Sequence, residues 1–77
     1  MDNSKLVAVI TRLDSMVKDN GEEVVSRRFE HNGTIKAVVY YDPTTTTFTL
    51  EDPETHQSFE FDNIDLIAIE IFELLDD

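Results

Sequence analysis

The two histidines are the side chains of this 77-residue chain best suited to hold a metal ion. His31 lies between two predicted strands, and His56 lies in a later predicted loop, close to Asp52 and Glu54. In an antiparallel meander both loops project from the same end of the sheet, about 10 Å apart because two strand spacings separate them. That distance is too large for one tetrahedral ion. We therefore expect no metal and no cofactor. A small metal- or ligand-binding protein that uses the His31/His56 end is an alternative hypothesis.

Catalytic residues are not evident either. The chain has no cysteine, so a nucleophile would have to be Ser, Thr or Lys, activated by a neighbouring base. None of the serines lies in a G-x-S-x-G turn. The two glycines, Gly21 and Gly33, are expected at a helix end and in a hairpin, so there is no glycine-rich phosphate loop. We therefore expect no enzyme activity and no catalytic residues.

The charge is strongly asymmetric along the chain. All six bases lie in the first 36 residues, where they balance six acids, whereas residues 37–77 carry eleven acids and no base. This half repels phosphate backbones and anionic lipid, so we expect neither nucleic-acid nor membrane binding. Acidic residues also serve solubility. A further alternative is an acidic mimic that binds a basic partner protein.

From the length of the chain we expect a single domain over residues 1–77. A domain of this size buries only about 60% of its unfolded surface. Without disulfides, its stability depends on a tightly packed core or on oligomerisation. No signal peptide is evident, and no apolar run reaches the roughly 18 residues of a membrane span. We therefore expect a soluble cytoplasmic protein.

The stretch NSKLVAVITRLDSMVKDNG, residues 3–21, is predicted to form a helix. Apolar residues recur there with the spacing of one helical face, namely Leu6, Val9, Ile10, Leu13, Met16 and Val17. Asn3 or Ser4 can cap its first N–H groups. The Asn20-Gly21 pair predicts the left-handed residue that ends the helix.

Four strands are predicted over residues 23–61, and the positions of apolar residues predict their register. For the first hairpin a three-residue loop over 31–33 keeps apolar residues on one face, whereas a two-residue Asn-Gly turn mixes the faces. The predicted pairs are Phe29–Ile35, Arg27–Ala37 and Val25–Val39. Arg27 would then face inward, with its stem over Ala37 and its head near Asp52 or the sheet end.

The next two hairpins each have a predicted four-residue loop that begins with proline, over residues 43–46 and 53–56. The resulting pairs are Tyr41–Phe48, Val39–Leu50, Leu50–Phe59 and Phe48–Phe61. The inner rows of the sheet become Tyr41–Phe48–Phe61 and Val25–Val39–Leu50–Phe59. Because these registers agree with one another, the sequence predicts an antiparallel meander.

The last segment, residues 64–75, is predicted to be a helix. Asp62 or Asn63 can cap it, and most of its apolar residues fall within one arc of the helical wheel. A strand is the competing interpretation, because Ile67, Ile69 and Ile71 alternate. Leu66 and Ile69 lie off the arc and need a second partner, which could be the first helix or another subunit.

The stretch FDNIDLIAIEIFELL, preceded by FEHNG and a strand ending in YYDP, resembles the YkuJ family of small uncharacterised proteins from Gram-positive bacteria. The resemblance covers nearly the whole chain. It implies a central antiparallel sheet flanked by helices and supplies no catalytic residues. It therefore agrees with the elements that the residue patterns predict.

Together these patterns predict an α+β fold of order α-β-β-β-β-α, a four-stranded antiparallel meander with both helices packed on one face. The other face would carry an apolar strip, in which Val24 pairs with Tyr40 and Val38 lies beside them. Bases (Arg28 and Lys36) would border the strip on one side and acids (Glu51 and Glu60) on the other. We expect a non-catalytic, self-associating protein-interaction module, most simply a homodimer of the bacterial cytosol. Its contact residues would be Val24, Val38 and Tyr40, or Leu66 and Ile69.

Overall fold

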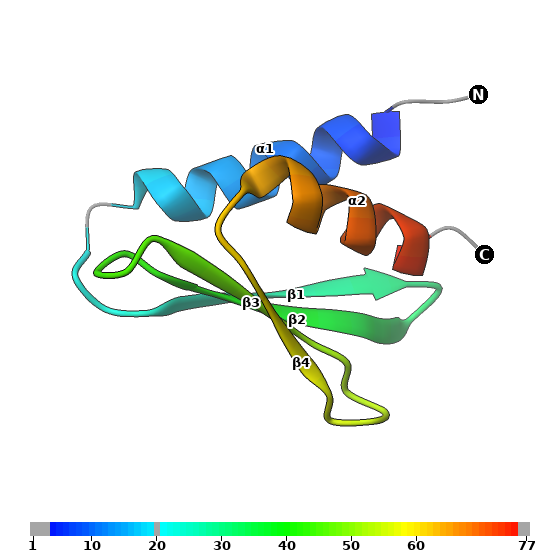
Figure 1. Cartoon of the computed structure of the whole chain (residues 1–77). Coiled ribbons are helices and arrows are strands. Elements are labelled where there is room, and N and C mark those ends of the chain that lie inside the picture. The colour runs from blue at the N-terminus through cyan, green and yellow to red at the C-terminus, as the bar shows by residue number, and fades with distance from the viewer. Residues whose placement is uncertain (1–3, 20, 76–77) are drawn as a thin grey trace.

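The computed structural model describes residues 4–19 and 21–75 (Figure 1). Its elements follow the order α1 (Ser4–Lys18), β1 (Val25–His31), β2 (Thr34–Asp42), β3 (Thr47–Glu51), β4 (Ser58–Phe61) and α2 (Ile64–Leu75). The strands form one antiparallel sheet in the order β1-β2-β3-β4. Both helices lie on the same side of it (Figure 1). The predicted α-β-β-β-β-α meander is confirmed.

Helix α1 buries the predicted apolar face. Val9, Leu13 and Met16 are buried, whereas Val17, which was expected on the same face, is exposed near the end of the helix. The proposed caps at Asn3 and Asn20 lie outside the described residues. Beyond the helix, the side chain of Asp19 accepts a hydrogen bond from the Gly21 N–H at 3.2 Å.

The predicted loop of the first hairpin is wrong. His31 pairs with Thr34, so the turn contains only Asn32 and Gly33. These two residues have φ values of 52° and 78°. Two consecutive positive φ angles define the I′ turn that Asn-Gly favours, because its twist matches that of the strands.

A β-bulge then changes the register beyond this turn. The pairing shifts between Phe29 and Glu30, which face Ala37 and Ile35, so Lys36 is the extra residue on β2. The observed pairs are Val25–Tyr41, Arg27–Val39 and Phe29–Ala37, in place of the predicted Val25–Val39, Arg27–Ala37 and Phe29–Ile35. The two registers differ by two residues on β2, an even number. The predicted faces of β1 therefore survive although its partners change.

The other two hairpins have the predicted registers. Tyr41 faces Phe48, Val39 faces Leu50, and Leu50 and Phe48 face Phe59 and Phe61. The rings of Tyr41 and Phe48 lie 4.7 Å apart between centroids. With the corrected first hairpin, the inner rows are Val25–Tyr41–Phe48–Phe61 and Arg27–Val39–Leu50–Phe59.

Both four-residue loops end on a residue with a left-handed backbone. Thr46 has a φ of 53° and His56 a φ of 61°. This conformation is unfavourable for a β-branched side chain and is tolerated much better by asparagine.

We therefore expect Thr46→Asn to raise the free energy of unfolding by about 0.5–1 kcal/mol, because it relieves this backbone strain. Urea unfolding monitored by circular dichroism measures the change. Thr45→Asn is the matched control, since Thr45 has no positive φ, and it should change the stability by less than about 0.5 kcal/mol. Equal effects of the two substitutions would show that the backbone of Thr46 is not strained.

Helix α2 completes the core, and the competing strand interpretation of residues 64–75 is wrong. The side-chain oxygen of Asn63 caps the helix by accepting the N–H of Asp65 at 2.8 Å. Ile67, Ala68 and Ile71 are buried, and the helix contacts all four strands as well as α1. Phe59, which was expected in a covered inner row, is instead 52% exposed.

Candidate interaction surfaces

The histidine end of the sheet is the candidate metal site that the sequence suggested. Asp52 organises its own loop, because its carboxylate accepts the Glu54 N–H at 2.9 Å and its carbonyl accepts the His56 N–H at 2.8 Å. His31 lies apart from them, in a hollow with Lys5 and Leu75. Within residues 4–19 and 21–75, no three His, Asp or Glu side chains are placed to hold one ion.

The outer face of the sheet carries Val38 and Tyr40 near its centre, both half-buried on β2. Neither helix covers this face (Figure 1). Two rows of side chains cross it, Arg28–Val38–Glu51–Ser58 and Ser26–Tyr40–Thr49–Glu60. Apolar and aromatic groups therefore lie in the middle, with Arg28 on one edge strand and Glu60 on the other.

Val24 does not join this strip as expected. It precedes β1 and is 55% exposed, and Ser26 rather than Val24 lies opposite Tyr40. Lys36, expected beside Arg28, is the bulged residue of β2 and lines a hollow with Asp52 and Leu74. The shorter turn and the bulge together explain both differences, because each moves β1 by one residue along β2 and the bulge turns Lys36 away from the regular alternation.

The phenol of Tyr40 is oriented by a neighbouring strand. Its hydroxyl donates a hydrogen bond to Oε1 of Glu51 at 3.2 Å. This bond, together with the negative charge of Glu51, raises the pKa of Tyr40 above its usual value. The ring therefore has a fixed polar end on the face where an apolar contact is expected.

Arg27 does not occupy the predicted position. It faces Val39 rather than Ala37, and its Nη1 donates to the carbonyl of Ser26 at 2.8 Å. Phe29 takes the place over Ala37 and is almost completely buried. A guanidinium that covers Ala37 and reaches Asp52 is therefore excluded as an anion site.

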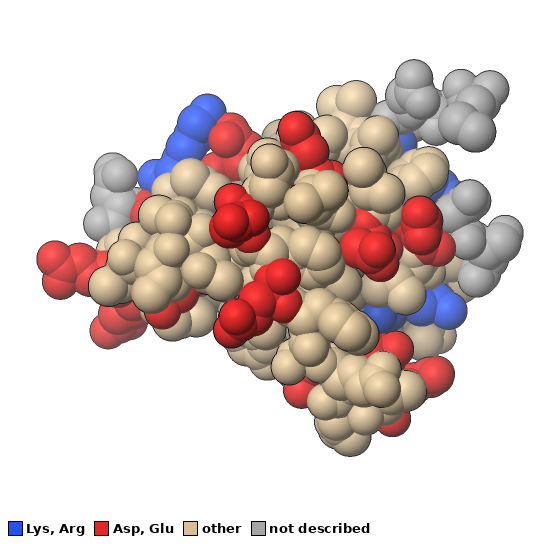
Figure 2. All heavy atoms as spheres, in the orientation of Figure 1, with Lys and Arg blue, Asp and Glu red and all other residues tan. Residues whose placement is uncertain are grey.

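The second predicted contact pair lies on the other side of the molecule. Leu66 and Ile69 are 55% and 48% exposed on α2, so α1 does not supply the partner they were expected to need. They alternate with acidic residues of the same helix, Asp65, Glu70 and Glu73. Figure 2 shows acidic side chains scattered over this side of the molecule, with the basic ones toward its margins. The two candidate surfaces are thus separate, and the structure does not bring them together.

Phe59 is a further exposed apolar side chain, and the sequence did not predict its exposure. It lines a hollow with Phe61, Glu60 and Glu70, between β4 and α2. Only residues 62 and 63 connect β4 to α2, so the helix begins directly after Phe61 and leads away from Phe59. No pattern in the sequence separates Phe59 from Phe61, because both lie on the inner face of β4.

Comparisons with known proteins agree with the fold. Residues 9–75 match a family model described as a protein of unknown function, DUF1797. The uncharacterized protein YkuJ of Bacillus subtilis (strain 168) is 40% identical over 77 residues, which cover 94% of this chain and 98% of YkuJ. The X-ray structure of YkuJ from Bacillus subtilis superposes with a TM-score of 0.88 at 38% identity, covering 95% of this chain and 99% of that one.

The predicted resemblance to YkuJ is therefore confirmed over nearly the whole chain. Neither helix among the described residues is long and apolar enough to cross a membrane. The match over residues 9–75 and the identity to YkuJ lead to one conclusion. The chain belongs to the DUF1797 family of proteins of unknown function.

Proposed function

We propose that this protein is a non-catalytic cytoplasmic interaction module that pairs with a second copy of itself through the outer face of its sheet. The observation that supports this proposal is the arrangement of that face. Its centre holds the half-buried Val38 and Tyr40, and no helix covers it. An uncovered face with an apolar centre and a charged border has the anatomy of a protein interface.

The charges on this face are self-complementary. Arg28 lies on β1, at one edge of the sheet, whereas Glu60 lies on β4, at the other. A two-fold axis that passes between β2 and β3 exchanges the two edges. Each Arg28 would then lie over β4 of the second copy, opposite Ser58 and one row of side chains from Glu60, so the same surface serves both protomers of an isologous dimer.

The size of the face indicates a weak dimer. Four strands spaced about 4.8 Å apart and about six residues long span roughly 400 Å². Two such faces bury about 800 Å² by this measure, below the 1,200 Å² of a stable complex. We therefore expect a reversible dimer with a dissociation constant of about 10–100 μM.

Side-chain chemistry supports the non-catalytic part of the proposal. The chain has no cysteine. The hydroxyl of Ser15 donates to the carbonyl of Arg12 at 3.1 Å, and the hydroxyl of Thr11 donates to the carbonyl of Val7 at 2.8 Å. These hydroxyls bond to helix carbonyls and not to a base that could activate them.

Sedimentation of Tyr40→Glu beside the wild type tests the proposal. The wild type should shift from monomer to dimer between about 10 and 500 μM, and Tyr40→Glu should stay monomeric because it places a second carboxylate beside Glu51 in the interface. Ile69→Glu is the matched control on α2, and it should dimerise like the wild type. Dimers lost in Ile69→Glu but kept in Tyr40→Glu would contradict the proposal, as would a monomeric wild type.

A charge exchange tests the two-fold arrangement without changing the apolar centre. Arg28→Glu alone should weaken the dimer, since it places two carboxylates at each edge contact. The double variant Arg28→Glu with Glu60→Arg should restore the dimer, because it exchanges the charges and keeps them complementary. Failure of the double variant to recover would rule out this two-fold pairing.

A further inference from the structure

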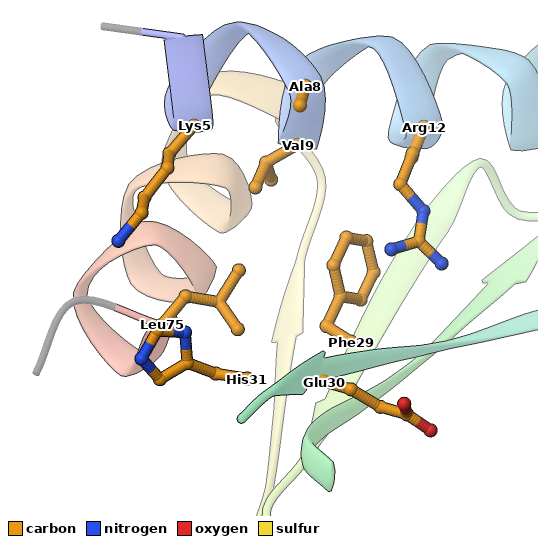
Figure 3. Close-up of a pocket in the computed structure, with 8 residues that line it drawn as sticks. All are labelled: Lys5, Ala8, Val9, Arg12, Phe29, Glu30, His31 and Leu75. Carbon is orange, nitrogen blue, oxygen red and sulfur yellow. The ribbon is translucent and has the colours of Figure 1, made fainter. Parts of the chain in front are cut away.

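One hollow of the molecule combines basic side chains with an apolar floor. It lies between the first half of α1, the end of β1 and the end of α2, and its volume is about 180 Å³ (Figure 3). Val9, Phe29 and Leu75 form its apolar lining. Three basic side chains also line it, namely Lys5 and Arg12 of α1 and His31 at the end of β1.

The charge of this hollow is opposite to that of the whole protein. The chain has a net charge of −11 and only six bases, yet Lys5 and Arg12 both lie here. Glu30 is the one acid among the described residues that line the hollow. Two bases against one acid give the hollow a net positive charge, which attracts ligands of negative charge.

The guanidinium of Arg12 is held in place by two contacts. Its central carbon lies 4.3 Å from the centroid of the Phe29 ring, and its Nη2 donates to the carbonyl of Arg28 at 3.0 Å. Stacking on an aromatic face and a fixed hydrogen bond orient a planar guanidinium. Arg12 thus forms a rigid wall of the hollow and contributes a fixed positive charge.

Lys5 and Arg12 lie at opposite ends of the hollow. They are two helical turns apart, about 10 Å along the axis of α1. Figure 3 shows Lys5 and His31 at the end beside Leu75, and Arg12 at the other end beside Phe29. Because Arg12 is already bonded to the Arg28 carbonyl, Lys5 is the cation better placed to take a new charged group.

The volume restricts the ligand to a small molecule. A cavity of about 150 Å³ holds benzene, whereas sites for drug-sized ligands measure about 300–1,000 Å³. A nucleotide is therefore too large, and a single ring or branched chain of similar size fits. The apolar lining favours a ligand with an apolar body, and Lys5 favours a ligand that also carries a negative group.

We propose that this hollow binds a small organic acid with an apolar body, with its carboxylate at Lys5 and its body against Ala8 and Leu75, the apolar lining residues that remain accessible. The site lies on the helix side of the sheet. It is therefore independent of the dimer proposed above, and the monomeric variant Tyr40→Glu should bind the same ligand.

Phenylacetate is a suitable probe, followed through the backbone amide signals in NMR spectra of the full chain. We expect signals of α1 and the end of β1 to shift with a dissociation constant of about 1–10 mM, the range for about ten non-hydrogen atoms. Benzyl alcohol, which lacks the charge, should bind about fivefold more weakly. Acetate, which lacks the ring, should leave these signals unchanged.

Three variants distinguish the site from general attraction to bases. Lys5→Gln should weaken phenylacetate about fivefold, and Ala8→Leu should block binding by filling the hollow without changing the charge. Lys18→Gln is the control, since it removes a positive charge from the same helix, outside the hollow, and it should bind like the wild type. Binding equally weakened by Lys18→Gln, binding unaffected by Ala8→Leu, or shifts outside this region would overturn the proposal.

Discussion

Replacing Ile71 by alanine is expected to lower the free energy of unfolding by about 3 kcal/mol, within the 2–5 kcal/mol typical of a buried isoleucine. Ile71 is fully buried in the core, where α2 meets the sheet. The total stability of a 77-residue domain is about 4–12 kcal/mol. The loss is therefore a large fraction of the total, and urea unfolding at a constant m-value should measure it directly.

Ile69 supplies the matched control on the same helix. It is 48% exposed, and alanine favours a helix more than isoleucine does, so Ile69→Ala should cost less than about 1 kcal/mol. In a strand, Ile67, Ile69 and Ile71 would face the same side and respond alike. Similar losses in Ile69→Ala and Ile71→Ala would therefore contradict the orientation of α2.

The helices and two of the three hairpins could be predicted because several signals agree there. In α2 the cap at Asn63 and the periodicity of the isoleucines both predict a helix, and the structure confirms it. The two later hairpins begin their loops with Pro43 and Pro53, and only one loop length aligns the apolar residues of both strands. Agreement between local and long-range preferences is what makes an element predictable.

The first hairpin shows why its register could not be predicted. The alternation of apolar residues distinguishes the two faces of a strand, but it does not distinguish registers that differ by two residues. Asn32 and Gly33 determine a two-residue turn, and a regular ladder from that turn would put apolar residues of β1 on the same face as polar residues of β2. The bulge at Lys36 shifts the register by one residue and so returns the apolar residues of both strands to the same face. A bulge is a packing solution, and no local residue pattern of this chain indicates it.

The candidate surfaces could be predicted only in part, for the same reason. The helical wheel places Leu66 and Ile69 off the buried arc, and the structure leaves them 55% and 48% exposed. The exposure of Phe59 depends on where α2 begins over the sheet. The basic hollow joins Lys5, His31 and Leu75 from three elements, so it exists only in the folded chain.

Phe29→Ala is expected to lower the free energy of unfolding by about 4 kcal/mol, within the 3–5 kcal/mol typical of a buried phenylalanine. The ring is 1% exposed, lies opposite Ala37 on the inner face, and supports the guanidinium of Arg12 at 4.3 Å. Removal of the ring leaves a cavity beside Ala37, and the small side chain of Ala37 cannot fill it. The loss of the cation–π contact adds about 0.5–1 kcal/mol.

Phe59→Ala is the control that makes this prediction specific, because sequence patterns place both phenylalanines on the inner face. Phe59 is 52% exposed, so its truncation should cost only about 1 kcal/mol. Thermal and urea unfolding of the two variants, each compared with the wild type, measure the difference. Equal losses would mean that α2 covers β4 as fully as β1, and the exposed surface around Phe59 would then not exist in solution. A fourfold difference would instead show that the helices cover the sheet unevenly, and that the aromatic edge of β4 remains accessible to a partner.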